Sequence, residues 1–311
     1  MNQNLYNEAI EYEQLTQKRL FIIGNGFDLH HGMKTSYWNF RNYLLETGTE
    51  ILRTMEMFNM FQEDLWSSFE ANLANIDVQL MYDYYSDSLV SYADDNWSDM
   101  YHHEFQYFIE QDTSYMSYEL ISQFVKWICS IDMPTKMSEG IAKCFTEVKD
   151  SFYLNFNYTP TLQNFYGINE EEVLHIHNRV VHERSEIILG HAVGKPPSNL
   201  DLGYGDVRLD EAYDLITQYY ATTHKSTASV IARNQSFFNS PNKYNEIIIM
   251  GHSLSDVDLP YIQRITSNLC HKNTRWYVSY YSEGEISSHR RSLEKCLISD
   301  NKVSFFRLSD L

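Results

Sequence analysis

The segment Phe21-Ile22-Ile23-Gly24-Asn25-Gly26-Phe27-Asp28-Leu29 combines an apolar run with residues that suit phosphate binding. We expect a strand that leads into Gly24-Asn25-Gly26 and a helix that begins within a few residues. Because glycine has no Cβ, the backbone can turn sharply there and approach a ligand closely. The free N–H groups at the start of the helix would face the same place, which predicts a diphosphate site. A strand-to-helix turn that binds nothing explains the pattern equally well.

Later apolar runs also end in residues that can bind nucleotides or transfer protons. The segments after these runs are Asn157-Tyr158-Thr159, His175-Ile176-His177-Asn178, Gly190-His191-Ala192 and Gly251-His252-Ser253-Leu254-Ser255-Asp256-Val257-Asp258. In open α/β sheets, ligands bind at the carboxyl ends of the strands. We therefore expect these segments to meet Gly24-Asn25-Gly26 at one edge of a sheet.

The elements that must position these residues alternate between strands and helices from residue 150 onward. Short apolar runs predict strands at 151–156, 173–176, 186–189, 246–250, 275–280 and 303–306, and helical patterns cover 209–232, 258–271 and 285–298. This alternation predicts an α/β fold with a parallel sheet covered on both faces. The strand before Gly24 is expected near its centre.

Residues 41–131 show helical spacing instead, with Leu44, Ile51 and Met55 among the recurring apolar positions and no proline before Pro134. We therefore predict a nucleotide-binding core of residues 19–40 and 150–311, with residues 41–149 as an inserted helical lobe. Residues 1–18 are predicted to form an N-terminal arm or helix.

The net charge of the chain is −18, and residues 41–150 hold 20 acidic against 6 basic residues. Nucleic-acid binding relies on Lys and Arg that neutralise phosphates, so a nucleic-acid partner is not expected. A solvated helical surface explains the acidic charge; a basic partner protein or a homo-oligomer interface with aromatic anchors is the alternative.

The sequence also indicates a compartment. No apolar run approaches the roughly 20 residues of a membrane span, and residues 1–17 lack the apolar centre of a secretion signal. The four cysteines are widely spaced and include no Cys-x-x-Cys pair, which is typical of reduced thiols. We therefore expect a cytoplasmic protein that does not bind membranes.

The motifs taken together resemble one family. Gly24-Asn25-Gly26-Phe27-Asp28-Leu29, Asn155-Phe156-Asn157-Tyr158-Thr159, His175-Ile176-His177, Gly190-His191 and Gly251-His252-Ser253-Leu254 with Asp258 are similar to the motifs of the bacteriophage abortive-infection AbiH family. The resemblance runs from about residue 19 to the last predicted strand. It implies a protein that stays quiescent until phage infection and is then toxic to the host cell.

The AbiH pattern itself resembles the NAD-binding Rossmann domain of sirtuins. Gly24, Gly26 and Gly32 have the spacing of the sirtuin glycine loop, and Gly251-His252-Ser253-Leu254 resembles the sirtuin Gly-Thr-Ser-Leu. Asn157 falls on the asparagine that orients the ribose, and His177 falls on the catalytic histidine. The resemblance therefore implies a sirtuin-like Rossmann fold that binds NAD as a substrate.

The implied reaction is cleavage of the bond between nicotinamide and ribose. Asn157 would orient hydroxyls or water, and His177 would be the base, because imidazole titrates near neutral pH. The residues expected to bind the dinucleotide are Gly24, Asn25, Gly26, Phe27, Asp28, Gly251, His252, Ser253 and Asp258. No metal is expected in this mechanism.

Three positions depart from the sirtuin pattern. Thr159 stands where sirtuins have an aspartate that helps to hold nicotinamide, Asn178 replaces a glycine, and Asp28 replaces a serine of the glycine loop. A carboxylate at position 28 would repel a diphosphate unless it caps the helix or binds ribose. The zinc ribbon of protein deacylases is missing, so protein deacylation is not expected.

Two other interpretations remain open. The first is a metal-dependent nuclease or hydrolase, because several residues near the predicted strand ends are ligand types that suit zinc or manganese: His175, His177, His191, His252, Asp256 and Asp258. The second is a non-catalytic nucleotide-sensing module of a defence complex.

Overall fold

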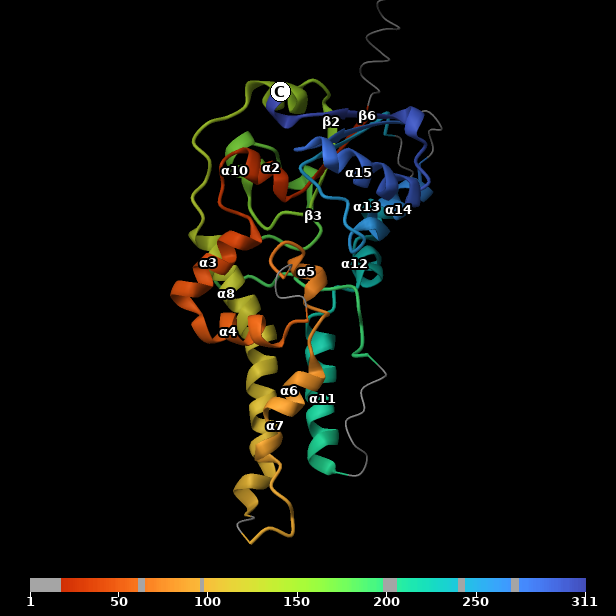
Figure 1. Ribbon diagram of the computed structural model, residues 1–311. Helices are drawn as coiled ribbons and strands as arrows, with labels where there is room; N and C mark the ends of the chain where they lie inside the picture. The colour runs from red at the N-terminus through yellow and green to blue at the C-terminus, as the bar shows by residue number, and fades with distance from the viewer. Residues whose placement is uncertain (1–17, 61–64, 96–97, 198–205, 240–243, 270–273) are drawn as a thin grey trace, which may run out of the picture. The chain divides into compact units, whose positions relative to one another are not determined.

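The computed structural model of the chain describes residues 18–60, 65–95, 98–197, 206–239, 244–269 and 274–311. The chain forms two compact units (Figure 1). Unit 1 consists of Met1–Ser36, Ser130–Val181 and Thr227–Leu311, and unit 2 consists of Tyr37–Cys129 and His182–Ser226. The predicted arm or helix at 1–18 lies almost entirely outside the described residues, and the predicted domain boundaries stay a prediction.

Unit 1 contains a six-stranded sheet in which each strand runs parallel to its neighbours. The strand order is β3-β2-β1-β4-β5-β6, so β1 is central as predicted. The strands are β1 (Lys18–Ile23), β2 (Asp150–Asn155), β3 (Val173–His175), β4 (Glu246–Met250), β5 (Arg275–Ser279) and β6 (Val303–Phe306). The predicted α/β fold with a parallel sheet is confirmed.

Helices cover both faces of this sheet (Figure 1). The unit 1 helices are α2 (Asn25–His30), α9 (Glu139–Thr146), α10 (Thr161–Tyr166), α12 (Thr227–Arg233), α13 (Gln235–Asn239), α14 (Leu259–Ser267) and α15 (Glu283–Lys295). Short 3₁₀ turns lie at Glu170–Glu172, Asp300–Lys302 and Leu308–Asp310. The helices α2, α9 and α10 pack on one face, where Phe27, Phe145 and Leu162 join side chains of β1, β2 and β4 in a buried cluster.

The central strands are apolar because both of their faces are buried. Leu20, Phe21, Ile22 and Ile23 of β1 are fully buried, so neither face of the strand offers a position that favours a polar residue. Their register is fixed by pairs such as Phe21 with Tyr153 on one side and Phe21 with Ile248 on the other.

One predicted strand is wrong. Residues 186–189 form no strand and belong to unit 2, although Ile187, Ile188 and Leu189 are apolar. An apolar run forms a strand only where a neighbouring chain offers hydrogen bonds, and here pairing begins two residues later as a single bridge between His191 and His224. Apolar runs of this length do not distinguish a strand from a buried irregular segment.

Unit 2 is helical, as predicted for 41–131. Its helices are α3 (Tyr37–Thr47), α4 (Thr49–Phe58), α5 (Phe69–Asn72), α6 (Val78–Tyr84), α7 (Asp99–Ser114), α8 (Leu120–Ser130, whose last residue belongs to unit 1) and α11 (Val207–Thr222), with a 3₁₀ turn at Ser86–Ser88. A π-helical turn at Tyr115–Glu119 joins α7 to α8. Helix α11 packs beside α7 within this unit.

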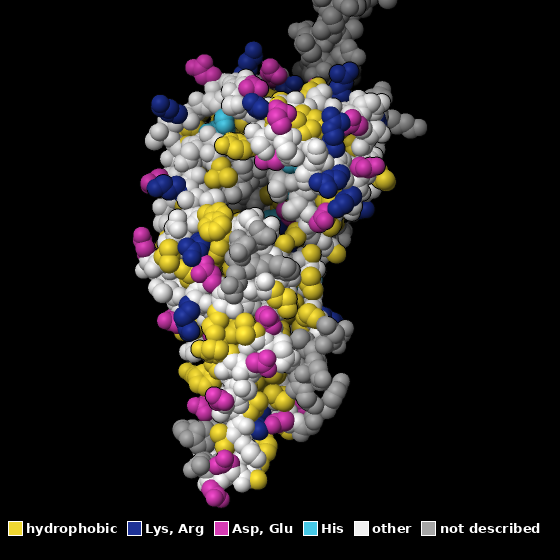
Figure 2. All heavy atoms as spheres, viewed as in Figure 1, with side chains coloured by type: hydrophobic (Ala, Val, Ile, Leu, Met, Phe, Trp, Pro, Cys, Tyr) yellow, Lys and Arg dark blue, Asp and Glu magenta, His cyan; other side chains and the backbone are white. Residues whose placement is uncertain are grey.

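Hydrophobic and acidic side chains alternate over much of the surface that Figure 2 shows. Tyr84, Tyr107 and Tyr118 are each more than half exposed. None of the described helices is long and apolar enough to cross a membrane.

Candidate functional site

The carboxyl edge of the sheet in unit 1 gathers most of the predicted site residues. The strand order reverses between β1 and β4, because β2 and β3 lie on one side of β1 and β4 to β6 lie on the other. In doubly wound sheets, ligands bind outside the carboxyl ends of the strands at this switch point. The segments that follow β1, β2, β3 and β4 all begin at this edge.

The glycine turn after β1 packs directly against the loop after β4. The backbone N–H of Gly24 donates to Met250 O over 3.0 Å, and that of Gly26 donates to Gly251 O over 2.7 Å. A Cβ on Gly26 would lie 2.8 Å from Gly251 Cα, and a Cβ on Gly24 would lie 2.5 Å from His252 Cα. The glycines at 24 and 26 are therefore required for this backbone-to-backbone contact.

This packing changes the interpretation of the glycine turn. The N–H groups of Gly24 and Gly26 bind the protein itself, and Phe27 N donates to Gly24 O over 2.9 Å. The N–H groups of Gly24, Gly26 and Phe27 are therefore occupied within the protein, and the predicted diphosphate site at the start of this helix stays a prediction. The glycines bring the ends of β1 and β4 together, and the polar side chains around them remain the candidate ligand-binding groups.

The other turn residues also have structural contacts. Asn25 donates through Nδ2 to Thr35 O over 2.9 Å and so holds the chain that follows α2. Phe27 is fully buried and contacts the rings of Phe145 and Tyr166. Its side chain belongs to the core of unit 1.

Asp28 is a buried carboxylate beneath the turn. Thr159 donates to Asp28 Oδ2 through its hydroxyl. Burial raises the pKa of Asp28 to about 6, and hydrogen bonds from Thr159, Thr161 and Asn157 partly offset the increase. Asp28 therefore accepts hydrogen bonds from side chains that follow β2, among them Thr159.

Asn157 links the β2 loop to the glycine turn. Its backbone N–H donates over 3.0 Å to Oδ1 of Asn155, the last residue of β2. Its side chain donates through Nδ2 to Gly24 O over 3.1 Å. These two contacts fix the direction of the buried amide at the edge of the sheet.

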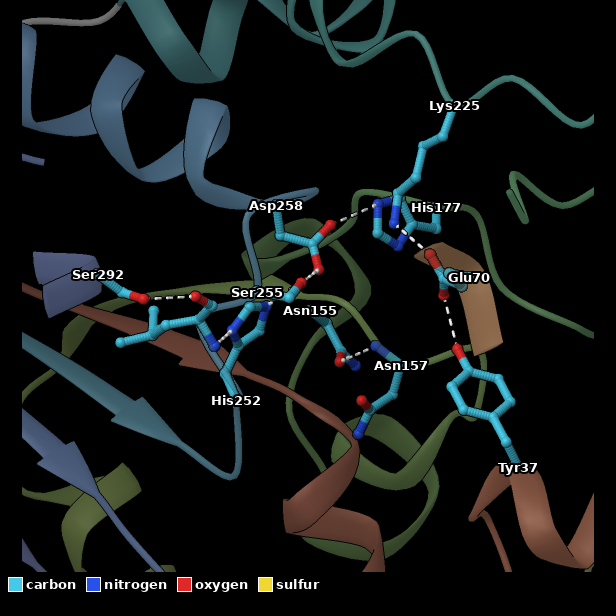
Figure 3. Close-up of polar contacts among 11 residues, drawn as sticks. Tyr37, Glu70, Asn155, Asn157, His177, Lys225, His252, Ser255, Asp258 and Ser292 are labelled. Atoms are coloured by element: carbon cyan, nitrogen blue, oxygen red, sulfur yellow. Dashed lines mark hydrogen bonds and ion pairs between the residues drawn. The ribbon is translucent and has the colours of Figure 1, made fainter. Parts of the chain in front are cut away.

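His177, Asp258 and His252 form a group in which one carboxylate faces two imidazoles (Figure 3). Asp258 Oδ1 lies 3.8 Å from His177 Nε2, and Asp258 Oδ2 lies 3.7 Å from His252 Nε2. Ser255 donates from Oγ to the same Oδ2 over 3.3 Å. Both imidazoles are buried, while the carboxylate is partly exposed.

Aromatic rings enclose this group. Phe156 presents its ring at steep angles to His252 and His177, with centroid distances of 4.2 and 5.4 Å. The rings of Tyr261 and Tyr158 lie 5.8 and 6.2 Å from that of His177. Aromatic rings packed beside an imidazole limit the access of water to it.

The loop that carries His252 has an unusual backbone. Leu254 adopts a left-handed conformation with φ of 54°, which is rare for a non-glycine residue. Two hydrogen bonds hold it there: Leu254 N donates to His252 Nδ1 over 2.9 Å, and Ser292 donates to Leu254 O over 2.8 Å. Ser253, which lies between His252 and Leu254 in the sequence, is exposed. A locally strained loop held in this way is common at functional sites.

His175 lies outside the group of His177, Asp258 and His252 and has hydrogen bonds of its own. Its Nδ1 donates to Asn157 O over 3.0 Å, and its Nε2 accepts from Gln163 over 2.9 Å. Burial lowers the pKa of His175 to about 4, so the ring is neutral near pH 7. Its hydrogen bond to Asn157 O holds the loop after β2 in place.

His191 lies in unit 2. It is fully buried, and its Nε2 donates to Thr223 Oγ1 over 2.9 Å while its Nδ1 accepts from Val193 N. Burial lowers its pKa to about 4. These contacts give His191 a structural role within unit 2.

Unit 2 contains a buried ion pair that the sequence pattern did not indicate. Lys225 Nζ lies 2.7 Å from Glu70 Oε2, and Tyr37 donates to Glu70 Oε1 over 2.6 Å (Figure 3). The Lys225 side chain is fully buried. Glu70 lies 155 residues away in the sequence, so no local spacing relates the two.

Among the described residues, no set of three or more His, Cys, Asp or Glu side chains is arranged to hold a metal ion.

The fold and the edge residues define an α/β protein with a Rossmann-like parallel sheet and polar side chains gathered at its switch point. The sequence model described as bacteriophage abortive infection AbiH matches residues 20–280, which is most of the chain. The chain therefore belongs to the AbiH family, and its membership supports a role in abortive infection against phage. A comparison with curated proteins gave no match.

Proposed function

We propose that this protein acts in anti-phage abortive infection by cleaving NAD at its nicotinamide–ribose bond. The observation that carries the proposal is that Asn157 and the His177–Asp258 pair lie at the same edge of the sheet, at its switch point. That edge is where doubly wound sheets bind dinucleotides. Loss of NAD would stop the metabolism of the infected cell and so limit phage production.

The reaction is a hydrolysis. The bond between ribose C1′ and the nicotinamide nitrogen breaks, and its electron pair stays on nicotinamide, which leaves as a neutral molecule. A water oxygen bonds to C1′, and the water gives one proton to His177. The products are nicotinamide, ADP-ribose and that proton.

No acid is needed to expel nicotinamide, because the leaving group is cationic before the bond breaks. The enzyme must instead orient the ribose and activate water. An imidazole base contributes about 10² to 10⁴ in rate when it is aligned with the proton that it accepts. The amide of Asn157, which is fixed by Gly24 and Asn155, would align a ribose hydroxyl or the water.

The test is NAD content in phage-challenged cells that express the wild type, His177→Ala or Asn157→Ala, measured by chromatography of extracted nucleotides. We expect NAD to fall and nicotinamide with ADP-ribose to rise only with the wild type. His103→Ala is the matched control, because His103 is an exposed histidine of α7 in unit 2, and it should retain activity.

One result would contradict the proposal: unchanged NAD in wild-type cells during a clear toxic response. Degraded tRNA or DNA in the same cells would favour the nuclease interpretation. Retention of intact NAD by the purified protein, without turnover, would favour the sensing module.

A further inference from the structure

We infer that Asp258 is a positioning residue that sets the tautomer and the basicity of His177. This inference rests on the proposed function, in which His177 is the base. The sequence pattern placed Asp258 among the dinucleotide-binding residues. In the structure its carboxylate instead faces the Nε2 atoms of His177 and His252.

The tautomer of His252 follows from its contacts. Its Nδ1 accepts a hydrogen bond from Leu254 N, so the neutral ring carries its proton on Nε2. That N–H faces Asp258 Oδ2 over 3.7 Å. The carboxylate oxygen therefore acts as an acceptor on this side, and the same carboxylate offers Oδ1 to His177.

The position of Asp258 is fixed by its place in the chain. Its N–H donates to Ser255 O over 2.9 Å, and its Oδ2 accepts from Ser255 Oγ over 3.3 Å. Helix α14 begins at the next residue, Leu259. These constraints keep Oδ1 directed toward His177, at a distance from Nε2 of 3.8 Å.

A carboxylate at this position has two consequences for His177. It stabilises the tautomer that carries the proton on Nε2, so Nδ1 is the nitrogen that accepts the proton from water. It also stabilises the imidazolium that results. The Nε2–Oδ1 distance exceeds a hydrogen bond, and such contacts commonly shorten when the substrate is bound.

The other titratable groups around the pair are His252 and the phenols of Tyr158 and Tyr261. A phenol that retains its proton carries no charge. Among these described neighbours in unit 1, Asp258 is the group that supplies negative charge to both imidazoles.

The kinetic test is Asp258→Asn in the full-length protein. The amide keeps the size of the carboxylate but removes its charge, so we expect kcat for NAD to fall by about 10² to 10⁴ with little change in KM. The acidic limb of the pH–rate profile should move to lower pH. Asp258→Glu should restore part of the activity.

Asp256→Asn is the matched control. Asp256 lies two residues away, is exposed and pairs with Lys295 over 2.6 Å, so its loss removes the same charge without touching either imidazole. We expect it to keep the wild-type kcat and pH profile. A wild-type kcat or pH profile in Asp258→Asn would overturn the inference.

An NMR titration separates this inference from the proposed function, because it needs no turnover. The imidazole Cε1–H signals of His177 and His252 can be assigned with the variants His177→Ala and His252→Ala. Both imidazole pKa values should be lower in Asp258→Asn than in the wild type. If they are unchanged, the inference fails, whereas a wild type that does not cleave NAD contradicts the proposed function alone.

Instability of Asp258→Asn would not prevent the test. Ser255→Ala removes only the hydroxyl that holds Asp258 Oδ2, and it should lower kcat by a smaller factor while both imidazoles still titrate as in the wild type. A lower melting temperature with unchanged kcat in Ser255→Ala would count against a positioning role for this carboxylate.

Discussion

The backbone N–H of Gly26 donates to the carbonyl oxygen of Gly251 over 2.7 Å, which joins the turn after β1 to the loop after β4. Both residues are glycines for the same reason. A Cβ on Gly251 would lie 2.0 Å from Phe27 N, and its φ of 66° is left-handed. The contact brings the strand ends at the switch point together and so fixes the backbone of the candidate site.

Gly26→Ala should therefore destabilise the protein. The added methyl group would lie 2.8 Å from both Cα and O of Gly251, and backbone atoms cannot move away cheaply. Overpacking of this kind typically costs about 1 to 3 kcal/mol, which urea unfolding would measure. Gly284→Ala is the control, because the nearest atom to its Cβ, Ser282 Oγ, lies 3.9 Å away. Equal stability of the two variants would contradict the packing argument.

The fold was largely predictable because the strands of unit 1 are short apolar runs that end in glycine or polar residues. The runs at 246–250 and 303–306 match β4 and β6, and the run at 151–156 matches β2 to within one residue. The apolar run before Gly24 forms the second half of β1. The run at 186–189 has the same composition but no neighbouring strand. Composition shows that a segment is buried, whereas pairing depends on distant segments of the chain.

Asp28 should make stability depend on pH. With a pKa of about 6 in the folded protein and an ordinary value of 3.8, it binds more protons folded than unfolded between these values. Its contribution to stability is therefore fully present below pH 3.8 and is lost as the pH rises through about 6. The difference is about 3 kcal/mol at 1.36 kcal/mol for each pKa unit.

The measurement is urea unfolding of the wild type and Asp28→Asn at several pH values from 4 to 7. Asparagine cannot ionise, so the stability of the variant relative to the wild type should increase across this range. His175 acts in the opposite direction, because its pKa is lowered to about 4 and its contribution is lost as the pH falls below 6.5. Comparing both proteins at each pH cancels that effect. A constant difference between them would show that Asp28 does not titrate in this range.

The candidate site was predictable in its membership but not in its contacts. The rule that ligands bind at the carboxyl ends of strands was enough to group Asn157, His177 and His252. It did not show that the N–H of Gly26 donates to Gly251 O or that Asp258 faces His177, because both contacts join segments that are far apart in the sequence. The left-handed backbone of Leu254, which lies between His252 and Asp258, has no sequence signature either.

The ion pair between Lys225 and Glu70 should contribute to the stability of unit 2. The Lys225 side chain is fully buried beside Glu70, whose other carboxylate oxygen accepts from Tyr37. Lys225→Met removes the cation and leaves the carboxylate without its charge partner, which commonly costs about 3 to 5 kcal/mol for a buried pair. Adding Glu70→Gln removes the remaining charge, so the double variant should recover most of the lost stability in urea unfolding. If the double variant is as unstable as Lys225→Met, shape rather than charge determines the contribution of Lys225.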